Sequence, residues 1–270
     1  MDFMYTYSDT VISRIIVGIF LSIGIVGCLS IGRRFDKFFK LNSDTNGTIG
    51  AFLSVTGVFY GILFGLVIIS VWDTHDEVED QVQSEASSLR QLYSVSALAD
   101  PKNTHHLRDH EREYARIVIN KEWPAQRLGN DAPSQYLEGY RVLREIRKDL
   151  FLLNQESGNT ISLSKNLSDA IDQLTIDRDV RISQVDAKIP GPLWKALLVL
   201  TAVNMLLLWL IRVENIILDV ILNSAVSLAI GLVFTFCFII DRPFQGNTSI
   251  DSSAIEAVYK NEMGGYAEAE

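Results

Sequence analysis

The chain has 270 residues, of which 48% are apolar and 21% are charged, and its formal net charge is −9. This excess of negative charge argues against a nucleic-acid partner, because phosphate binding needs clustered Lys and Arg in excess. A mean hydropathy of +0.17 with so many charged residues requires the two populations to be segregated along the chain. The composition is therefore typical of a membrane protein that also carries a polar domain.

Four windows of the sequence are long and apolar enough to cross the roughly 30 Å hydrocarbon layer of a bilayer as helices. We expect the first to be a retained anchor and not a cleaved leader peptide, because Asp2 and Asp9 precede it and the basic residues follow it. We therefore expect an all-α integral membrane protein, embedded in the lipid bilayer by four transmembrane helices at residues 11–31, 48–72, 193–211 and 216–240.

The loop after the first window sets the expected orientation. Short basic loops stay on the cytoplasmic side of a membrane, and this loop contains Arg33, Arg34, Lys37 and Lys40. Both termini and residues 73–192 are then expected outside the cytoplasm, in a bacterial inner membrane. Three basic residues count against this orientation, since it places them on the outer side: Arg181, Lys188 and Lys195.

The second window contains a narrow stripe of small residues at spacings of three or four, from Gly50 and Ser54 to Gly65. Such a stripe lets another helix approach closely. A second interpretation is that several copies of this helix surround an axis, where aromatic residues form a hydrophobic constriction that gates by dewetting. The candidate pore or helix-packing residues are Gly57, Phe59, Tyr60, Gly61, Phe64 and Gly65.

An acidic run at residues 73–85 follows the second window and contains no Lys or Arg. In an oligomer it would form a ring at the mouth of a central pathway, where it would concentrate cations and repel anions. The alternative is a solvated helix face. The candidate vestibule charges are Asp73, Asp76, Glu77, Glu79 and Asp80.

Residues 73–192 form a long polar segment between the second and third windows. Apolar residues recur there at helical spacing in three stripes, and strand-like alternation is weak. We expect an antiparallel helical bundle that continues the membrane helices beyond the bilayer, including a helix at 104–122 that ends at Pro124.

These patterns predict four parts in the order of the chain. A transmembrane hairpin at 1–72 is followed by the polar helical bundle at 73–192 and a second transmembrane hairpin at 193–240. Residues 241–270 form a C-terminal segment, and its last ten residues from Asn261 are expected to be disordered.

Polar residues inside the windows carry a functional hypothesis by default. Asn204, Asp219 and Asn223 would line a water path or hydrogen-bond between helices, and Asp219 could instead pair with Arg212 at the interface. Both cysteines fall inside apolar windows and are interpreted as small buried residues, with no disulfide or metal role: Cys28 and Cys237.

Two features of the polar segment bear on binding or stability. His106, His110 and Glu113 have a spacing that could supply zinc ligands, although no Cys lies nearby and an exposed polar helix face is the alternative. Arg178 lies on the apolar stripe between Leu174 and Ile182, so it needs a buried partner. The partners to test are Glu85 and Glu122, in a structural ion pair or a gating contact.

The chain lacks a phosphate-binding glycine loop, a serine elbow and a paired metal motif. We therefore expect neither an enzyme nor a bound cofactor.

Several short motifs together resemble the bacterial bestrophin-like family. In chain order they are "VFYGILFGLVIISVW" in the second window, "SEA" at 84–86, "EWP" at 122–124, "DRDVR" at 177–181, "LW" at 193–194 and "DRPFQG" at 241–246. The resemblance covers almost the whole chain. It implies a pentameric ion channel with four spans per subunit, a helical domain between spans two and three, and a Pro-Phe-Gly-like segment after span four.

The sequence departs from that family plan in two respects. Bestrophins keep both termini and the helical domain in the cytosol, whereas the basic loop at 32–40 predicts the reverse. The acidic run at 73–85 also fits poorly with an anion pathway.

The "DRPFQG" motif marks the point where the fourth span leaves the membrane. Asp241 and Arg242 are expected at the interface, Pro243 limits further helix, and Gly246 closes the motif. Phe244 is then expected near the membrane surface, as an aromatic anchor or an inter-subunit contact. The sequence as a whole favours an oligomeric channel for passive ion conduction, and the alternative is a membrane-anchored interaction or sensor protein.

Overall fold

The computed structural model describes residues 9–32, 43–98, 101–129, 133–156, 161–186, 188–211 and 213–264. Each regular element in these ranges is a helix, and four of the helices are long and apolar enough to cross a membrane. The predicted all-α class with four spans is confirmed. The chain divides into two compact units: a membrane unit of Met1–Asp73 with Lys188–Asp241, and a polar unit of Thr74–Ala187 with Arg242–Glu270.

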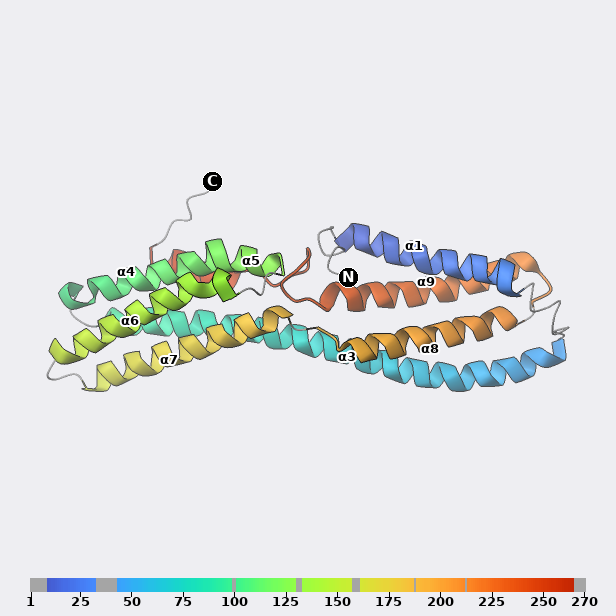
Figure 1. Ribbon diagram of the computed structural model, residues 1–270, viewed down its shortest axis with the longest axis horizontal. Coiled ribbons are helices and arrows are strands. Elements are labelled where there is room, and N and C mark those ends of the chain that lie inside the picture. Colours follow the sequence, from blue (N-terminus) through green and yellow to red (C-terminus); the bar gives the residue numbers. More distant parts are fainter. Residues whose placement is uncertain are drawn as a thin grey trace. The chain divides into compact units, whose positions relative to one another are not determined.

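The membrane unit pairs its helices tightly. Figure 1 shows the first helix beside the last span, and the first part of α3 beside α8. Small residues allow this approach: a Cβ atom on Gly24 would lie 2.0 Å from Oγ of Ser227. The elements are α1 (Asp9–Gly27), the π-helical turn η2 (Cys28–Gly32), the first part of α3 (Ser43–Ser96), α8 (Gly191–Leu210) and α9 (Ile216–Ile240).

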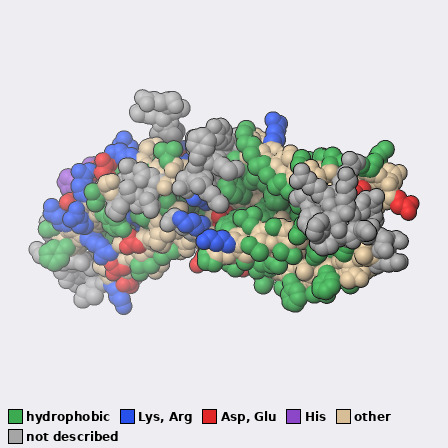
Figure 2. Space-filling model, turned by 45° about the vertical axis from the view of Figure 1, so that its right-hand side comes forward, with side chains coloured by type: hydrophobic (Ala, Val, Ile, Leu, Met, Phe, Trp, Pro, Cys, Tyr) green, Lys and Arg blue, Asp and Glu red, His purple; other side chains and the backbone are tan. Residues whose placement is uncertain are grey.

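Helix α3 is longer than a membrane span. Its 54 residues correspond to about 80 Å of helix, against a hydrocarbon layer of roughly 30 Å. The predicted span at 48–72 is therefore only one part of a helix that contributes to both units. Figure 2 shows the change in surface: hydrophobic side chains cover the visible face of the membrane unit, whereas charged side chains gather on the polar unit.

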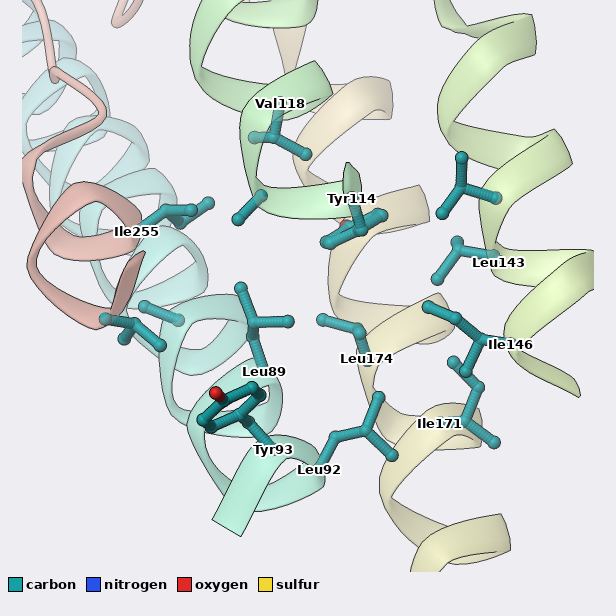
Figure 3. Packing of buried hydrophobic residues seen from close by; sticks show 14 of the residues in the cluster. Leu89, Leu92, Tyr93, Tyr114, Val118, Leu143, Ile146, Ile171, Leu174 and Ile255 are labelled. Carbon is teal, nitrogen blue, oxygen red and sulfur yellow. The ribbon is translucent and has the colours of Figure 1, made fainter. Parts of the chain in front are cut away.

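The polar unit surrounds one hydrophobic core. Figure 3 shows Leu89 and Leu92 of α3 in one cluster with side chains from other helices, including Tyr114, Ile146, Leu174 and Ile255. The other elements of this unit are α4 (Pro101–Ile117), the π-helical turn η3 (Val118–Glu122), α5 (Trp123–Arg127), η4 (Pro133–Tyr136), α6 (Leu137–Glu156), α7 (Ile161–Ser183), η5 (Gln184–Asp186) and α10 (Ser253–Asn261).

Pro124 does not end a helix, contrary to the prediction for residues 104–122. The chain passes from α4 through η3 directly into α5, and Pro124 lies in the first turn of α5. Glu122, directly before α5, is itself helical, so the chain stays helical across Pro124. The proline follows the π-helical turn η3, where the hydrogen bonds already depart from the regular α-helical pattern.

The C-terminal segment contains a helix that the sequence reasoning missed. In α10, Ile255 and Val258 are fully buried in the core of the polar unit, and Met263 beyond its end is also buried. Asn261–Gly264 of the tail predicted to be disordered are thus placed, and residues 265–270 lie outside the described ranges. A helix of nine residues carries too little periodicity to be recognised from sequence.

Candidate functional site

The candidate pore residues of α3 fall into two groups. Phe64 is buried in the membrane unit, where its ring lies 5.2 Å from that of Phe234 on α9. Tyr60 lies against Phe64, with ring centroids 5.2 Å apart, and its hydroxyl bonds the Thr201 hydroxyl of α8 at 3.2 Å. These two aromatic residues pack within their own chain.

The other candidates lie on parts of the α3 surface that the described part of the chain leaves uncovered. Phe59 is 64% exposed, and a Cβ atom on Gly61 or Gly65 would meet no atom within 4 Å. A Cβ atom on Gly57 would meet only Oδ1 of Asn204 within 4 Å, at 3.8 Å. Large exposed apolar residues line one face of this uncovered surface, on a different side of the helix from Gly57 and Gly61, at alternating spacings of three and four: Phe52, Val55, Phe59, Ile62, Leu66 and Ile69.

That spacing is the pattern of a helix seam in which several helices pack around a common line. The glycine stripe does not pack against another described helix of the same chain, apart from the approach of Asn204 to Gly57. A close-packing partner for the stripe would therefore have to come from outside the described chain.

The candidate vestibule charges follow on the same helix. Asp73, Asp76, Glu77, Glu79 and Asp80 are all exposed. His75, Asp76 and Glu79 bring one potential metal-ligating atom each to within 4.8 Å of one another. Exposure of this kind is equally consistent with a solvated helix face.

A buried ion network lies in the polar unit and consists of Glu85, Glu122, Arg178 and Arg181. All four side chains are fully buried. Glu85 comes from α3, Glu122 ends η3, and α7 supplies both arginines three residues apart, on one side of the helix. Two guanidinium groups and two carboxylates balance to zero formal charge, as buried charges require.

Arg181 is the centre of this network. Its Nε donates to Oε2 of Glu85 at 2.5 Å, and its Nη2 donates to Oε2 of Glu122 at 2.7 Å. The remaining nitrogen, Nη1, donates to Oε1 of Gln126 at 2.9 Å. The guanidinium also lies 5.1 Å from the ring centre of Trp123. One side chain thus connects α3, η3 and α5 to α7.

Arg178 completes the network on the other side of Glu122. Its Nη2 donates to Oε1 of Glu122 at 2.6 Å and to the carbonyl oxygen of Tyr136 at 2.9 Å. Its guanidinium lies 4.0 Å from the ring centre of Tyr140, an arrangement that favours cation–π attraction. Of the two partners considered from sequence, Glu122 bonds Arg178, whereas Glu85 bonds Arg181.

The packing around the network is close. A Cβ atom at Gly139 would lie 2.2 Å from Oε1 of Glu122 and 2.6 Å from Nη2 of Arg178. Tyr114 donates its hydroxyl to Oε1 of Glu85 at 2.6 Å. The backbone of α6 can approach the ion pair at this point only because residue 139 has no side chain.

Electrostatics holds both arginines in the charged form. Burial alone would lower the pKa of Arg181, but the carboxylates of Glu85 and Glu122 outweigh this effect and raise its pKa well above the usual value. Burial raises the pKa of Tyr114 well above its usual value, and the Glu85 carboxylate adds to this rise. The Tyr114 hydroxyl therefore remains a hydrogen-bond donor to Glu85.

The "DRPFQG" motif connects to the polar unit beyond Asp241. The Asp241 carboxylate accepts a hydrogen bond from the backbone N–H of Ile189 at 2.6 Å. The Phe244 ring is 1% exposed and meets Trp123 edge to face, with centroids 5.9 Å apart. Phe244 is thus a core residue of its own chain, and the prediction of a surface anchor or inter-subunit contact is wrong.

The rest of the motif forms a turn. Nη1 of Arg242 lies 3.4 Å from Oε1 of Gln245, Pro243 is buried, and Gly246 adopts a φ of 86° that favours glycine. The sequence offered one signal for this contact, which the prediction did not use: Trp123 and Phe244 each stand beside a proline. In the structure both side chains belong to the same hydrophobic core.

The polar residues in the spans mostly make hydrogen bonds. Thr56 of α3 donates to Oδ1 of Asn204 on α8 at 3.0 Å, a contact between helices. Asn223 donates to the carboxylate of Asp219 one turn earlier on α9. Arg212, a partner suggested for Asp219, lies outside the described residues.

The histidines do not converge on a metal centre within the described residues. His110 bonds Asp149 of α6 at 2.7 Å, whereas His105 pairs with Asp109 on its own helix. Glu113 faces Arg141 at 3.9 Å. Each group therefore has a different neighbour.

Comparisons with known proteins identify the fold. A family model described as "Bestrophin-like domain" matches residues 19–255. The crystal structure of a variant bacterial bestrophin homologue from Klebsiella pneumoniae superimposes with a TM-score of 0.72 at 10% identity, covering 94% of this chain and 99% of that one. Another structure of a homologue from Klebsiella pneumoniae gives 0.68 at 12% identity, with coverages of 95% and 99%. At such identities the similarity establishes the fold alone. No curated protein matches the chain.

Proposed function

Because the chain belongs to the bestrophin-like family, we propose that it is an oligomeric membrane channel that conducts ions passively. The observation that carries the proposal is the uncovered face of α3, where large apolar residues recur as in a multi-helix seam. A homo-oligomer supplies the missing neighbours, and five copies are the number that the family resemblance implies.

In this proposal several copies of α3 surround an axis. Phe59, Ile62 and Leu66 point inward and form a hydrophobic constriction that gates by dewetting. The glycine stripe, including Gly61 and Gly65, lies on another side of α3 and lets a helix of a neighbouring copy approach closely there. The exposed acidic residues that follow on α3 form a ring at one mouth and favour cations there.

Substitution of Gly61 by Leu tests this arrangement. No atom lies within 4 Å of a Cβ atom at Gly61, so the added side chain has no clash inside the chain and should leave the subunit folded. Gly18→Leu on α1 is the matched control, because Gly18 is also exposed with no atom within 4 Å. In reconstituted bilayers, Gly61→Leu should lose single-channel conductance, whereas Gly18→Leu should conduct like the parent protein.

A membrane-anchored interaction or sensor protein would behave differently. It would show no single-channel current in the unsubstituted protein across pH, calcium concentration and voltage. Phe59→Ala provides a second readout, because removal of a ring from the constriction should increase conductance. Equal currents from the parent, Gly61→Leu and Phe59→Ala proteins would refute the role of α3.

We also propose that the protein lies in a bacterial inner membrane with its termini and polar unit outside the cytoplasm. The basic residues at 33–40 support this orientation through the positive-inside rule. A cysteine introduced at exposed Ser94 of the polar unit reports the side directly. Labelling by an impermeant thiol reagent from the cytoplasmic side alone would reverse the proposed orientation.

A further inference from the structure

Three polar side chains meet where η2 packs against the first turns of α9. Sγ of Cys28 donates to Oδ2 of Asp219 at 3.2 Å. Asn223 donates through Nδ2 to Oδ1 of the same carboxylate at 2.9 Å and to the backbone oxygen of Asp219 at 3.0 Å. π-Helical turns such as η2 are rare in proteins, and those that occur are often found at functional sites.

The amide oxygen of Asn223 lacks a hydrogen-bond partner although this residue is 2% exposed. Nδ2 of Asn223 donates to two oxygen atoms of Asp219, and both of these atoms are acceptors. If the amide oxygen and nitrogen exchanged places, the oxygen would face these acceptors and would still lack a donor. The covalent geometry of the amide places this oxygen within roughly 5 Å of the Asp219 carboxylate. A buried acceptor without a donor is costly, and it indicates a missing ligand such as a cation.

We infer that Cys28, Asp219 and Asn223 form a binding site for a divalent metal ion of borderline softness, such as Zn²⁺ or Cd²⁺. The donor set contains one sulfur, one carboxylate oxygen and one amide oxygen, and the sulfur selects against Mg²⁺ and Ca²⁺. In tetrahedral zinc sites a sulfur and an oxygen ligand lie roughly 3.6 Å apart, as follows from the bond lengths. The observed separation of 3.2 Å needs only a small opening.

Metal binding at this site replaces a hydrogen bond. The S–H bond of Cys28 breaks, a sulfur–metal bond forms, and the proton leaves to solvent. The ion then takes the place of the thiol proton between Cys28 and Asp219, and Asn223 supplies its unused oxygen. Binding would join η2 to α9 and stabilise the membrane unit.

Cadmium titration of the purified full-length protein tests the site. The unsubstituted protein should develop the ultraviolet cadmium–thiolate absorption band with one ion per chain, and its melting temperature should rise. Cys237→Ser is the matched control, because Cys237 is also buried and has a carboxylate, Asp241, one turn later. The Asp241 carboxylate is already bonded to the backbone N–H of Ile189.

The substitutions give opposite expectations. Cys237→Ser should retain the band and the melting shift, whereas Cys28→Ser should lose both. Asp219→Asn keeps an oxygen that accepts the thiol hydrogen, so it remains informative if Cys28→Ser fails to fold. Asp219→Asn should weaken cadmium binding at least about tenfold. Substitution of a residue that only hydrogen-bonds to a metal ligand already weakens metal binding by about this factor, and loss of a direct ligand should weaken it at least as much.

The inference is wrong if Cys28→Ser keeps the band, if Cys237→Ser abolishes it, or if Asp219→Asn binds cadmium like the parent. None of these measurements depends on ion conduction.

Discussion

Replacement of Arg181 by Met should lower the free energy of unfolding by about 3–5 kcal/mol, the range for removing one partner of a buried ion pair. Arg181 reaches both Glu85 and Glu122, whereas Arg178 reaches only Glu122 of these two carboxylates. Without Arg181, the carboxylate of Glu85 keeps only the hydroxyl of Tyr114 among the contacts described above. A fully buried carboxylate would then lack a counter-charge.

The pH dependence of this loss provides a second signature. In the Arg181→Met protein, the Glu85 carboxylate would be buried without a counter-charge, which penalises its charged form. Acid that neutralises the carboxylate relieves this penalty, so the loss of stability should be smaller at acidic pH. Glu85→Gln in the same protein removes the charge and should recover part of the loss.

Thermal and denaturant unfolding in detergent measure these effects. The control is Arg147→Met, because Arg147 pairs with Asp172 at 2.6 Å on the exposed surface. Exposed pairs contribute about 0–1 kcal/mol, so this substitution should change stability little. If Arg181→Met unfolds like Arg147→Met, or if its penalty does not depend on pH, the network does not stabilise the polar unit as argued.

Three further substitutions test the packing of the polar unit. Gly139→Ala should lower the free energy of unfolding by about 1–3 kcal/mol, because its Cβ atom would lie 2.2 Å from Oε1 of Glu122. Gly191→Ala is the control, because a Cβ atom there would meet no atom within 4 Å. Burial raises the pKa of Glu111 from 4.5 to about 8, so stability should fall as pH rises through this window, and Glu111→Gln should flatten the fall. Phe244→Ala should cost about 3–5 kcal/mol by leaving a cavity, without changing the oligomer measured by light scattering.

The four spans were predictable because their cause is local. A run of about 20 apolar residues is sufficient to predict a membrane helix, whatever it packs against. Apolar length does not, however, tell which face of α3 is covered by other helices. In hydrocarbon all faces of a helix are apolar, so periodicity does not distinguish Phe64, which is buried, from Phe59, which is exposed.

The ion network was predictable only in part. An arginine on an apolar stripe requires a buried carboxylate, which identified the need of Arg178 for a partner. The spacing of Arg178 and Arg181 places both on the same side of α7, and sequence alone does not assign either to Glu85 or Glu122. The role of Gly139 could not be predicted from sequence. It depends on the close approach of α6 to the ion pair of Glu122 and Arg178, which lie on other helices.

The convergence of the short motifs separates stability from the proposed conduction. "SEA" supplies Glu85, "EWP" supplies Glu122 and Trp123, "DRDVR" supplies both arginines, and "PFQG" supplies the ring packed on Trp123. These contacts lie inside the polar unit, so their first consequence is a stable fold. Residues that decide which ions pass must instead be accessible to ions. In the described chain, the uncovered face of α3 meets that requirement, and substitutions there should alter conductance with little effect on unfolding.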